Sequence, residues 1–286
     1  MRIGIIGAEN SHAASVAKVI NVEQRFPGVR VECLWGETEA DARKTAEAGQ
    51  IPTIVDSPRE MLGRVDAIMV DHRHGKHHLR AARPFVERGL PAFIDKPFCF
   101  CAAEGREFLK LARQHGAPIT SFSTMTLQKS FLRFRREQLA AGEARGGATW
   151  GPCDVRSPYG GVFFYGVHHV EMALDAFGDQ VAAVRLTPSG TNAIAQLLYP
   201  SGCEVTLHFY APGCGFFQIA AVTGKGLVTR QLVSDASPYY AGVKRMIQMF
   251  RSGIEPASHE RLLKPVQILE ALARSLKSGR AETLRV

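Results

Sequence analysis

Short apolar runs alternate with helical segments through the first part of the chain, and this alternation limits the possible fold more than any other feature. Uninterrupted apolar runs are typical of parallel strands that are buried on both faces. Six such strands joined by helical crossovers predict a doubly wound, Rossmann-type parallel sheet. The expected strands are Arg2–Ile6, Val29–Trp35, Ile54–Val55, Ala67–Val70, Ala92–Ile94 and Pro118–Ser121. The expected helices are Ser11–Val22, Glu39–Ala48, Pro58–Leu62, His77–Arg88 and Ala102–His115.

Glycines follow three of these helices, at Gly49, Gly89 and Gly116. A glycine just after a helix commonly adopts the left-handed conformation that ends it. We therefore expect each of the three to terminate its helix.

The pattern changes near Gly142–Gly151, after a basic helical stretch. The later runs are longer, are separated by Gly/Pro/Ser turns such as PSG and APGCG, and predict an open, mostly antiparallel sheet. We expect a Rossmann dinucleotide-binding domain at 1–122 and an α+β substrate and oligomerisation domain at 123–286, whose final helix can pack back on the first domain. The expected elements are strands Val181–Pro188, Ala193–Tyr199, Glu204–Tyr210, Phe216–Val222 and Leu227–Leu232 and helices Val167–Phe177 and Leu262–Lys277.

Length and composition support this two-domain organisation. A chain of 286 residues with 45% hydrophobic content exceeds what one core usually serves. No apolar run is long enough for a signal-peptide core or a membrane span, so we expect a cytoplasmic protein with no membrane partner. The six cysteines are dispersed, which indicates reduced, partly buried thiols rather than a disulfide framework.

The chain is basic, with 35 Lys+Arg against 27 Asp+Glu. This excess favours an anionic substrate or a phosphate-bearing cofactor. The densest basic stretch, LQKSFLRFRREQLAAGEAR, alternates charges with apolar residues at helical spacing. That spacing is typical of the solvated face of an amphipathic helix, so we expect no nucleic-acid partner.

The turn after the first strand is the first candidate binding feature. In dinucleotide sites a G-x-G-x-x-G turn directs backbone N–H groups and a helix N-terminus at a pyrophosphate. Here only Gly7 remains, because Glu9 and His12 stand where the second and third glycines belong. Asn10, Ser11 or a protonated His12 are possible replacement donors; the alternative is a strand–helix turn that binds no ligand.

An acidic residue after the second strand usually binds the ribose hydroxyls of the cofactor. In VRVECLWGETEA the expected place is Gly36, and Glu37 follows it. Glu37 would favour NAD over NADP, because its charge repels a 2′-phosphate.

Two later segments resemble the glucose-fructose oxidoreductase/inositol dehydrogenase (Gfo/Idh/MocA) family. The stretch VDAIMVDHRHGKHHLRAARPFVERGLPAFIDKPF is similar to the family's His-bearing helix and the strand that ends in Glu-Lys-Pro, here Asp95-Lys96-Pro97. The stretch GGVFFYGVHHVEMALDAFG resembles its D-x-G-x-H-x-x-D motif, with His168 as the histidine. The resemblance spans nearly the whole chain and implies a nicotinamide-dependent oxidoreductase acting on a sugar, cyclitol or related polyol.

The resemblance implies that Lys96 and His168 meet the substrate hydroxyl that is oxidised. Loss of hydride from a carbinol carbon leaves a proton on oxygen, so a base must lie within hydrogen-bond reach. A nearby cation stabilises the developing alkoxide charge. We expect Lys96 in the second role and His168 in the first.

The chain departs from the family pattern at Phe164, which replaces the aspartate expected four residues before His168. Tyr165, His169 or Glu171 could partly replace that carboxylate, and we place Tyr165 among the catalytic residues. His169 and Glu171, with His78 of the earlier segment, are the expected substrate-binding residues.

Histidines are concentrated in Asp71-His72-Arg73-His74-Gly75-Lys76-His77-His78. Histidine is a common metal ligand, and Asp71 could join such a site. Arg73 and Lys76 interrupt the run, however, and we expect a polar loop beside the cofactor and no metal. The full expected cofactor set, for NAD or NADP, is Gly7, Glu9, Asn10, Ser11, His12, Glu37, His72, His74, Asp95 and Lys96.

Two functions remain open from sequence. Retention of both Lys96 and His168 favours the oxidoreductase. The lost glycines and Phe164 favour a protein of the same fold without net redox activity, either a lyase or isomerase or a noncatalytic sugar-binding or regulatory subunit. An open antiparallel sheet exposes an apolar face, so we expect a homo-dimer or homo-tetramer that forms through the C-terminal sheet.

Overall fold

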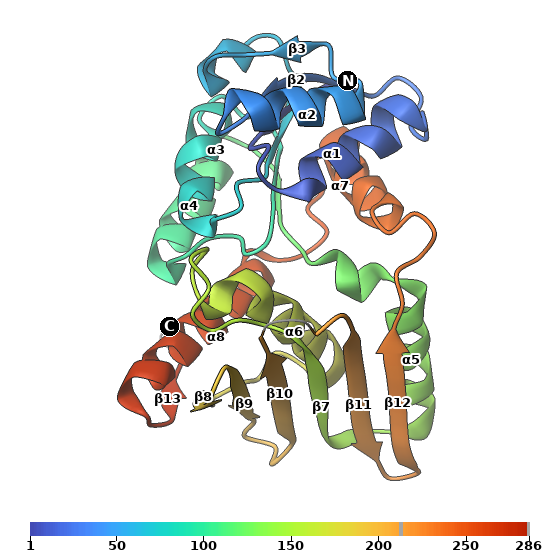
Figure 1. Cartoon of the computed structure of the whole chain (residues 1–286), viewed down its shortest axis with the longest axis vertical. Helices are drawn as coiled ribbons and strands as arrows, with labels where there is room; N and C mark the ends of the chain where they lie inside the picture. The colour runs from blue at the N-terminus through green and yellow to red at the C-terminus, as the bar shows by residue number, and fades with distance from the viewer. Residues whose placement is uncertain (212–213, 285–286) are drawn as a thin grey trace. The chain divides into compact units, whose positions relative to one another are not determined.

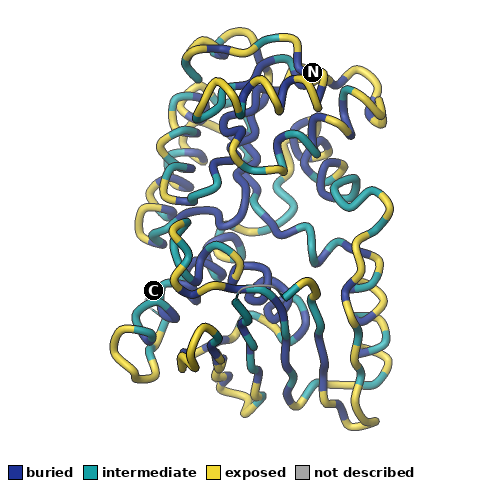
Figure 2. The backbone as a smooth tube through the Cα atoms, in the orientation of Figure 1, coloured by how far each residue is buried: buried dark blue, intermediate teal, exposed yellow. Residues whose placement is uncertain are grey.

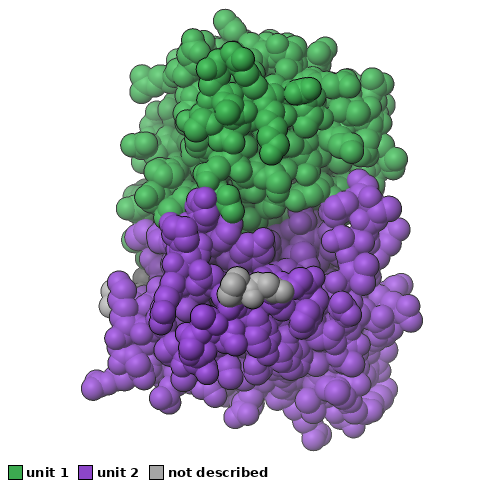
Figure 3. Space-filling model, viewed as in Figure 1, with its two compact units in different colours: residues 1–99, 103–122, 239–262 green, residues 100–102, 123–238, 263–286 purple. Residues whose placement is uncertain are grey.

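The computed structural model describes residues 1–211 and 214–284 and divides into two compact units. The first unit comprises residues 1–99, 103–122 and 239–262, and the second comprises 100–102, 123–238 and 263–286 (Figure 3). The main division thus lies at residue 122, and one later segment returns to the first unit. In the described residues no helix is both long and apolar enough to cross a membrane.

A six-stranded parallel sheet forms the centre of the first unit (Figure 1). Its order is β3-β2-β1-β4-β5-β6, the doubly wound order predicted from the sequence. The central strands are buried along nearly their whole length, which explains their uninterrupted apolar runs (Figure 2). The bounds are β1 (Arg2–Ile6), β2 (Arg30–Trp35), β3 (Thr53–Ile54), β4 (Ala67–Val70), β5 (Ala92–Ile94) and β6 (Ile119–Thr120).

Five α-helices belong mainly to this unit: α1 (Ser11–Ala17), α2 (Glu39–Gly49), α3 (His78–Val86), α4 (Ala102–Gln114) and α7 (Tyr240–Ser252). Helix α1 continues directly into a π-helical segment, Lys18–Val22. Helix α7 was absent from the sequence prediction; its buried face includes Val243, Met246 and Ile247.

The predicted role of Gly49 is wrong, whereas Gly89 and Gly116 do take positive φ values of 75° and 64°. Gly49 is the last residue of α2, and Gln50 takes the left-handed conformation instead, with φ of 48°. A Cβ at Gly49 would lie 2.5 Å from the Cβ of Ala17. Glycine is needed there so that α1 and α2 can approach each other closely.

The second unit is a seven-stranded mixed sheet in the order β12-β11-β7-β10-β9-β8-β13, with helices on one face. In this sheet, all described strand pairs are antiparallel except β7 with β10. Buried and exposed residues alternate along β8, β9 and β10, so one face of the sheet is covered and the other is open (Figure 2). The strands are β7 (Ala144–Pro152), β8 (Ala183–Ser189), β9 (Asn192–Leu198), β10 (Glu204–Tyr210), β11 (Phe217–Thr223), β12 (Gly226–Leu232) and β13 (Glu282–Thr283).

The helices of this unit are α5 (Lys129–Ala141), α6 (Val162–Phe177) and α8 (His259–Ser278). The basic stretch is the amphipathic helix α5, which buries Phe131 and Phe134 and pairs Glu137 with Arg133 and Arg230. Helix α6 begins five residues earlier than predicted, and β7 is a full strand that the sequence showed only as a change of pattern. The predicted APGCG turn includes residues 212 and 213, which lie outside the described residues.

Thiol chemistry agrees with the sequence prediction. All six cysteines are free; Cys33, Cys99 and Cys153 are buried and the other three are partly buried. Burial raises the pKa of the Cys153 thiol far above its usual range, so this group is inert as a nucleophile.

Candidate active site

The carboxyl ends of β1, β4 and β5 bring three polar segments of the first unit together. These strands are neighbours in the sheet, and all three point the same way. The glycine turn follows β1, Asp71 follows β4, and Asp95-Lys96 follows β5. Open parallel sheets bind ligands at this edge, so the fold collects the candidate residues where such sites form.

Gly7 is required by the backbone of the turn after β1. Its φ is 113°, and a Cβ there would lie 2.6 Å from the carbonyl carbon of Asp71 and 2.7 Å from the nitrogen of His72. The first glycine of the fingerprint is thus retained because the turn passes directly against the backbone that follows β4.

Glu37 lies against this turn from the end of β2. Its Oε2 accepts hydrogen bonds from the N–H groups of Ala8 (2.7 Å) and Glu9 (3.0 Å). Its Oε1 is buried and has no hydrogen-bond partner among the described residues. The turn therefore binds a carboxylate of its own chain through backbone amides and leaves one acceptor oxygen unused.

The carboxylate of Glu9 is balanced by Arg73, a residue that the sequence analysis used only as an argument against a metal. The Arg73 guanidinium lies 3.7 Å from Glu9 Oε1. A carboxylate where the second glycine belongs is thus paired with a cation from the loop after β4. The sequence already showed a carboxylate in the turn, Glu9, and a cationic residue in the loop after β4, Arg73, which together could have predicted this ion pair.

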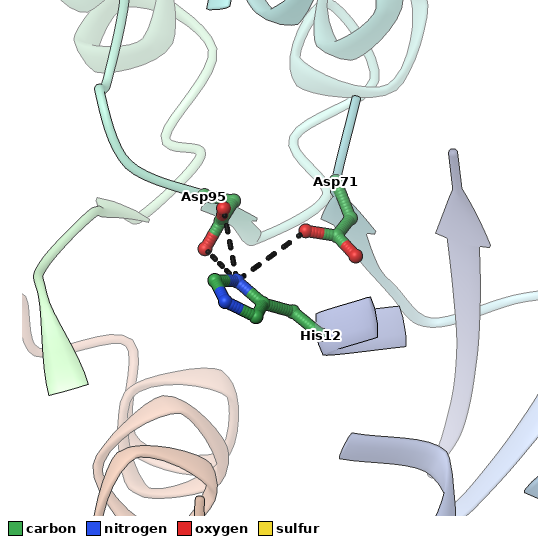
Figure 4. Close-up of side chains that lie close together, drawn as sticks. All are labelled: His12, Asp71 and Asp95. Carbon is green, nitrogen blue, oxygen red and sulfur yellow. Dashed lines mark hydrogen bonds and ion pairs between the residues drawn. The ribbon is translucent and has the colours of Figure 1, made fainter. Parts of the chain in front are cut away.

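His12, at the third glycine position, faces two buried aspartates (Figure 4). Its Nδ1 lies 3.1 Å from both carboxylate oxygens of Asp95 and 3.8 Å from Oδ1 of Asp71. Asn10 Nδ2 donates to Asp71 Oδ1 (3.0 Å) and Asp95 Oδ2 (3.2 Å), and Lys96 Nζ lies 3.4 Å from Asp95 Oδ2.

The two carboxylates have opposite electrostatic environments. Burial and the negative charge of Asp95 raise the pKa of Asp71 well above its usual range. Burial also opposes ionisation of Asp95, but His12 and Lys96 outweigh it and hold the pKa of Asp95 below its usual range. Asp95 is thus an ion-paired carboxylate, whereas the surroundings of Asp71 oppose its ionisation.

The histidine run folds as a structural loop around this edge. Burial lowers the pKa of His72 to about 3, so its ring, which packs against Trp35, is neutral. His74 Nδ1 accepts from the N–H of Lys76 and caps a short 3₁₀ turn. His78 is fully buried, and its two ring nitrogens contact the carbonyl oxygens of His72 (2.8 Å) and Pro97 (2.9 Å). His78 therefore joins the loop after β4 to the segment after Lys96.

In the second unit, α6 positions His168. Its Nδ1 lies 2.7 Å from the hydroxyl of Ser123, a fully buried residue that precedes the 3₁₀ turn Thr124–Leu127. The Ser123 hydroxyl is thus a hydrogen-bonding partner of His168, and nothing in the spacing of the sequence indicates it. Tyr165 makes an edge contact with the His168 ring, with ring centroids 5.6 Å apart.

His169 and Glu171 are inside the second unit. His169 is fully buried; its Nδ1 lies 2.8 Å from Thr149 Oγ1, and its ring packs on Phe209. Burial lowers the pKa of His169 to about 3. Glu171 is 8% exposed. The structure therefore brings His168 and Tyr165 together but does not bring His169 to an accessible surface.

The first unit fits a dinucleotide in most respects. The turn after β1 presents backbone amides that already bind an anionic oxygen, and α1 begins after Asn10 without a side-chain cap. Glu37 follows β2, where a carboxylate commonly binds the ribose hydroxyls of a dinucleotide. The misfit is Glu37 Oε2, which occupies donors of the turn.

Comparison with known proteins identifies this architecture. Residues 1–122 match the Gfo/Idh/MocA family, described as an oxidoreductase family with an NAD-binding Rossmann fold. The N-terminal domain is thus similar to the NAD-binding domain of that family. A search of curated proteins gives no match.

Solved structures match the chain over nearly its whole length. A probable dehydrogenase from Thermotoga maritima has a TM-score of 0.85 at 15% identity and covers 99% of each chain. A putative myo-inositol dehydrogenase from Sinorhizobium meliloti 1021 has a TM-score of 0.84 at 17% identity and covers 100% of each. GenD2 from gentamicin A biosynthesis, solved with NAD, has a TM-score of 0.85 at 16% identity and covers 100% of this chain and 97% of that one. The second unit thus also has the fold seen in these solved structures.

Proposed function

We propose that this chain is a nicotinamide-dependent oxidoreductase that interconverts a hydroxyl and a ketone on a sugar, cyclitol or related polyol. The observation that carries the proposal is Lys96, a buried ammonium group at the ligand-binding edge of a Gfo/Idh/MocA-family domain. The polyol class is supported by the structural neighbours, several of which are titled inositol dehydrogenases.

The proposed chemistry assigns separate roles to Lys96 and His168. A bound nicotinamide would supply the hydride acceptor or donor. Lys96 stabilises negative charge on the reacting oxygen, and Asp95 at 3.4 Å holds the ammonium in place. His168 exchanges the proton, and the Ser123 hydroxyl, 2.7 Å from its Nδ1, holds the ring in place. Tyr165 packs against this ring in an edge contact.

The cofactor would be held by the turn after β1 and the loop after β4. Glu37 Oε1 would accept a ribose hydroxyl, which favours NAD over NADP. Asn10, Ser11 and His12 remain the proposed donors toward the pyrophosphate side. His72 and His74 shape the loop beside the ring, and His78 positions that loop.

A specific observation favours a second candidate, a lyase or isomerase of the same fold. Glu37 Oε2 occupies two backbone donors of the turn, and its negative charge would oppose a pyrophosphate placed on them. Lys96 and His168 could then act as cation and base without hydride transfer.

The test begins with NADH and NADPH titrations monitored by nicotinamide fluorescence and by thermal shift. We expect NADH to bind with a Kd below about 100 µM and to raise Tm. If no dinucleotide binds at about 1 mM, the oxidoreductase proposal is rejected and the lyase or isomerase is favoured.

The role of Lys96 is tested with Lys96→Met, assayed on a panel of cyclitols and aldoses. We expect kcat to fall at least about 100-fold while the Kd for NADH changes less than about threefold. Lys76→Met, in the neighbouring loop, is the matched control and should retain activity. A Lys96→Met variant with wild-type turnover excludes the proposed role.

A further inference from the structure

His12, Asp71 and Asp95 form a cluster with the composition of a cation site. One ligand atom from each residue can be chosen so that all lie within 4.8 Å of one another. The three side chains come from α1 and from the ends of β4 and β5, and they converge on one point (Figure 4). None of the three lies within the histidine run 72–78, although Asp71 directly precedes it.

The spacing of the atoms suits direct coordination. Tetrahedral ligands with metal bonds of about 2.1 Å lie about 3.4 Å apart. Here His12 Nδ1 is 3.1 Å from Asp95 Oδ1 and 3.8 Å from Asp71 Oδ1.

Asn10 supplies a fourth polar atom at the same point. Its Nδ2 lies 3.0 Å from Asp71 Oδ1, 3.2 Å from Asp95 Oδ2 and 3.4 Å from His12 Nδ1. A half-turn of the amide places Oδ1 where Nδ2 now lies. The amide can therefore donate to the carboxylates without a cation and accept a cation when one is present.

Asp71 provides an independent indication that a cation belongs here. It is fully buried, and its Oδ2 has no hydrogen-bond partner among the described residues. Buried carboxylates are normally paired with a cation or bound to a metal, and the nearest ammonium, Lys96, pairs with Asp95.

We propose that His12, Asp71 and Asp95 bind one divalent transition-metal ion, with the Asn10 amide oxygen as an additional ligand. Imidazole with carboxylates suits Zn²⁺ or Mn²⁺ better than Ca²⁺ or a thiol-loving ion. The ion would supply the buried side chain of Asp71 with a cationic partner. This site is distinct from any site formed by the histidines of residues 72–78.

The experiment uses the full chain after dialysis against a chelator. Zn²⁺ is titrated calorimetrically, and Mn²⁺ is titrated by electron paramagnetic resonance. We expect one ion per chain with a Kd below about 10 µM, and at least about 30-fold weaker binding in Asp71→Asn and in His12→Gln. The double variant His74→Gln/His77→Gln should bind as the wild type does, because it removes only histidines of the loop.

Three results would overturn the proposal. They are no binding up to about 1 mM, unchanged binding in both site variants, or loss of binding in the His74→Gln/His77→Gln control. Far-UV circular dichroism and urea unfolding establish that each variant is folded. If His12→Gln does not fold, the isosteric Asp71→Asn still tests the proposal. NADH titrations on the same metal-free samples separate this proposal from the proposed redox function, because either can fail without the other.

Discussion

Glu37 lies where the sequence predicts an acidic residue, but its contacts differ from the predicted ones. The sequence placed it beside the ribose end of a cofactor, one residue beyond the usual acid. In the structure one of its oxygens is bound by the turn and the other is unused. A local sequence pattern indicates that a carboxylate is near the turn, but not which backbone amides it accepts, because that depends on side-chain rotamers.

Glu37→Gln should shift cofactor preference toward NADP. The amide retains an acceptor for the turn but removes the charge that opposes a 2′-phosphate. We expect the ratio of NADPH to NADH affinity to rise about tenfold, equivalent to about 1.4 kcal/mol. Fluorescence titration of both cofactors measures it. Glu39→Gln, an exposed carboxylate in the first turn of α2, should leave the ratio unchanged; an equal shift in both variants would indicate a general charge effect.

His169 should make the protein less stable in acid. Burial lowers its pKa from 6.5 to about 3, so below pH 6.5 the unfolded chain binds a proton that the folded chain does not. The resulting loss of unfolding free energy is absent above pH 6.5 and grows as the pH falls toward 3. It reaches about 2–3 kcal/mol at pH 4.5.

Urea unfolding of wild type and His169→Asn between pH 7.5 and 4.5 tests this expectation. The variant loses the Thr149 contact and should be less stable at pH 7.5, but its free energy of unfolding should fall less steeply below pH 6.5. His115→Asn, at an exposed position, is the control. Parallel curves for wild type and His169→Asn would show that this histidine does not titrate as described.

At the scale of elements, sequence predicted most of what is set by local periodicity. All six strands of the first sheet and their order were predicted, because apolar runs and crossovers determine them. Helix α7 was missed although Val243, Met246, Ile247 and Phe250 repeat at helical spacing. Ser123 was missed because its contact with His168 joins residues 45 positions apart, which local spacing does not reveal.

The Gly7 turn is the element most sensitive to a single methyl group. Gly7→Ala would place a Cβ 2.6 Å from the backbone after β4 and would force a non-glycine residue to φ of 113°. Gly63 has φ of 82° with open space around it, so Gly63→Ala isolates the backbone cost of about 1–2 kcal/mol. Chemical unfolding should show Gly7→Ala to be less stable than Gly63→Ala by at least about 2 kcal/mol. Equal losses would mean that β1 and β4 can separate at no cost.

At the scale of the molecule, the open face of the second sheet is the feature that the fold itself leaves unexplained. Exposed apolar residues occur on β9 and β11, with Ile194 at 42% and Val222 at 49% exposure. Between these strands, Trp150 of β7 stacks on His208 of β10, with centroids 5.2 Å apart. The helices pack on the opposite face, where Ile219 and its neighbours form a core with α5. An aromatic and apolar face of this kind favours self-association through the sheet.

Ile194→Asp should therefore weaken a homo-oligomer. The substitution places a charge at the centre of the proposed interface without touching the core, because alternate residues of β9 face the helices. We expect light scattering after size exclusion to give a dimer or tetramer for the wild type and a dissociation constant at least about tenfold higher for the variant. Leu139→Asp, at a position of α5 that is 67% exposed, is the matched control and should leave the mass unchanged. A wild-type chain that is monomeric at about 100 µM, or an Ile194→Asp variant with unaltered mass, would show that this face has no copy of the chain as its partner.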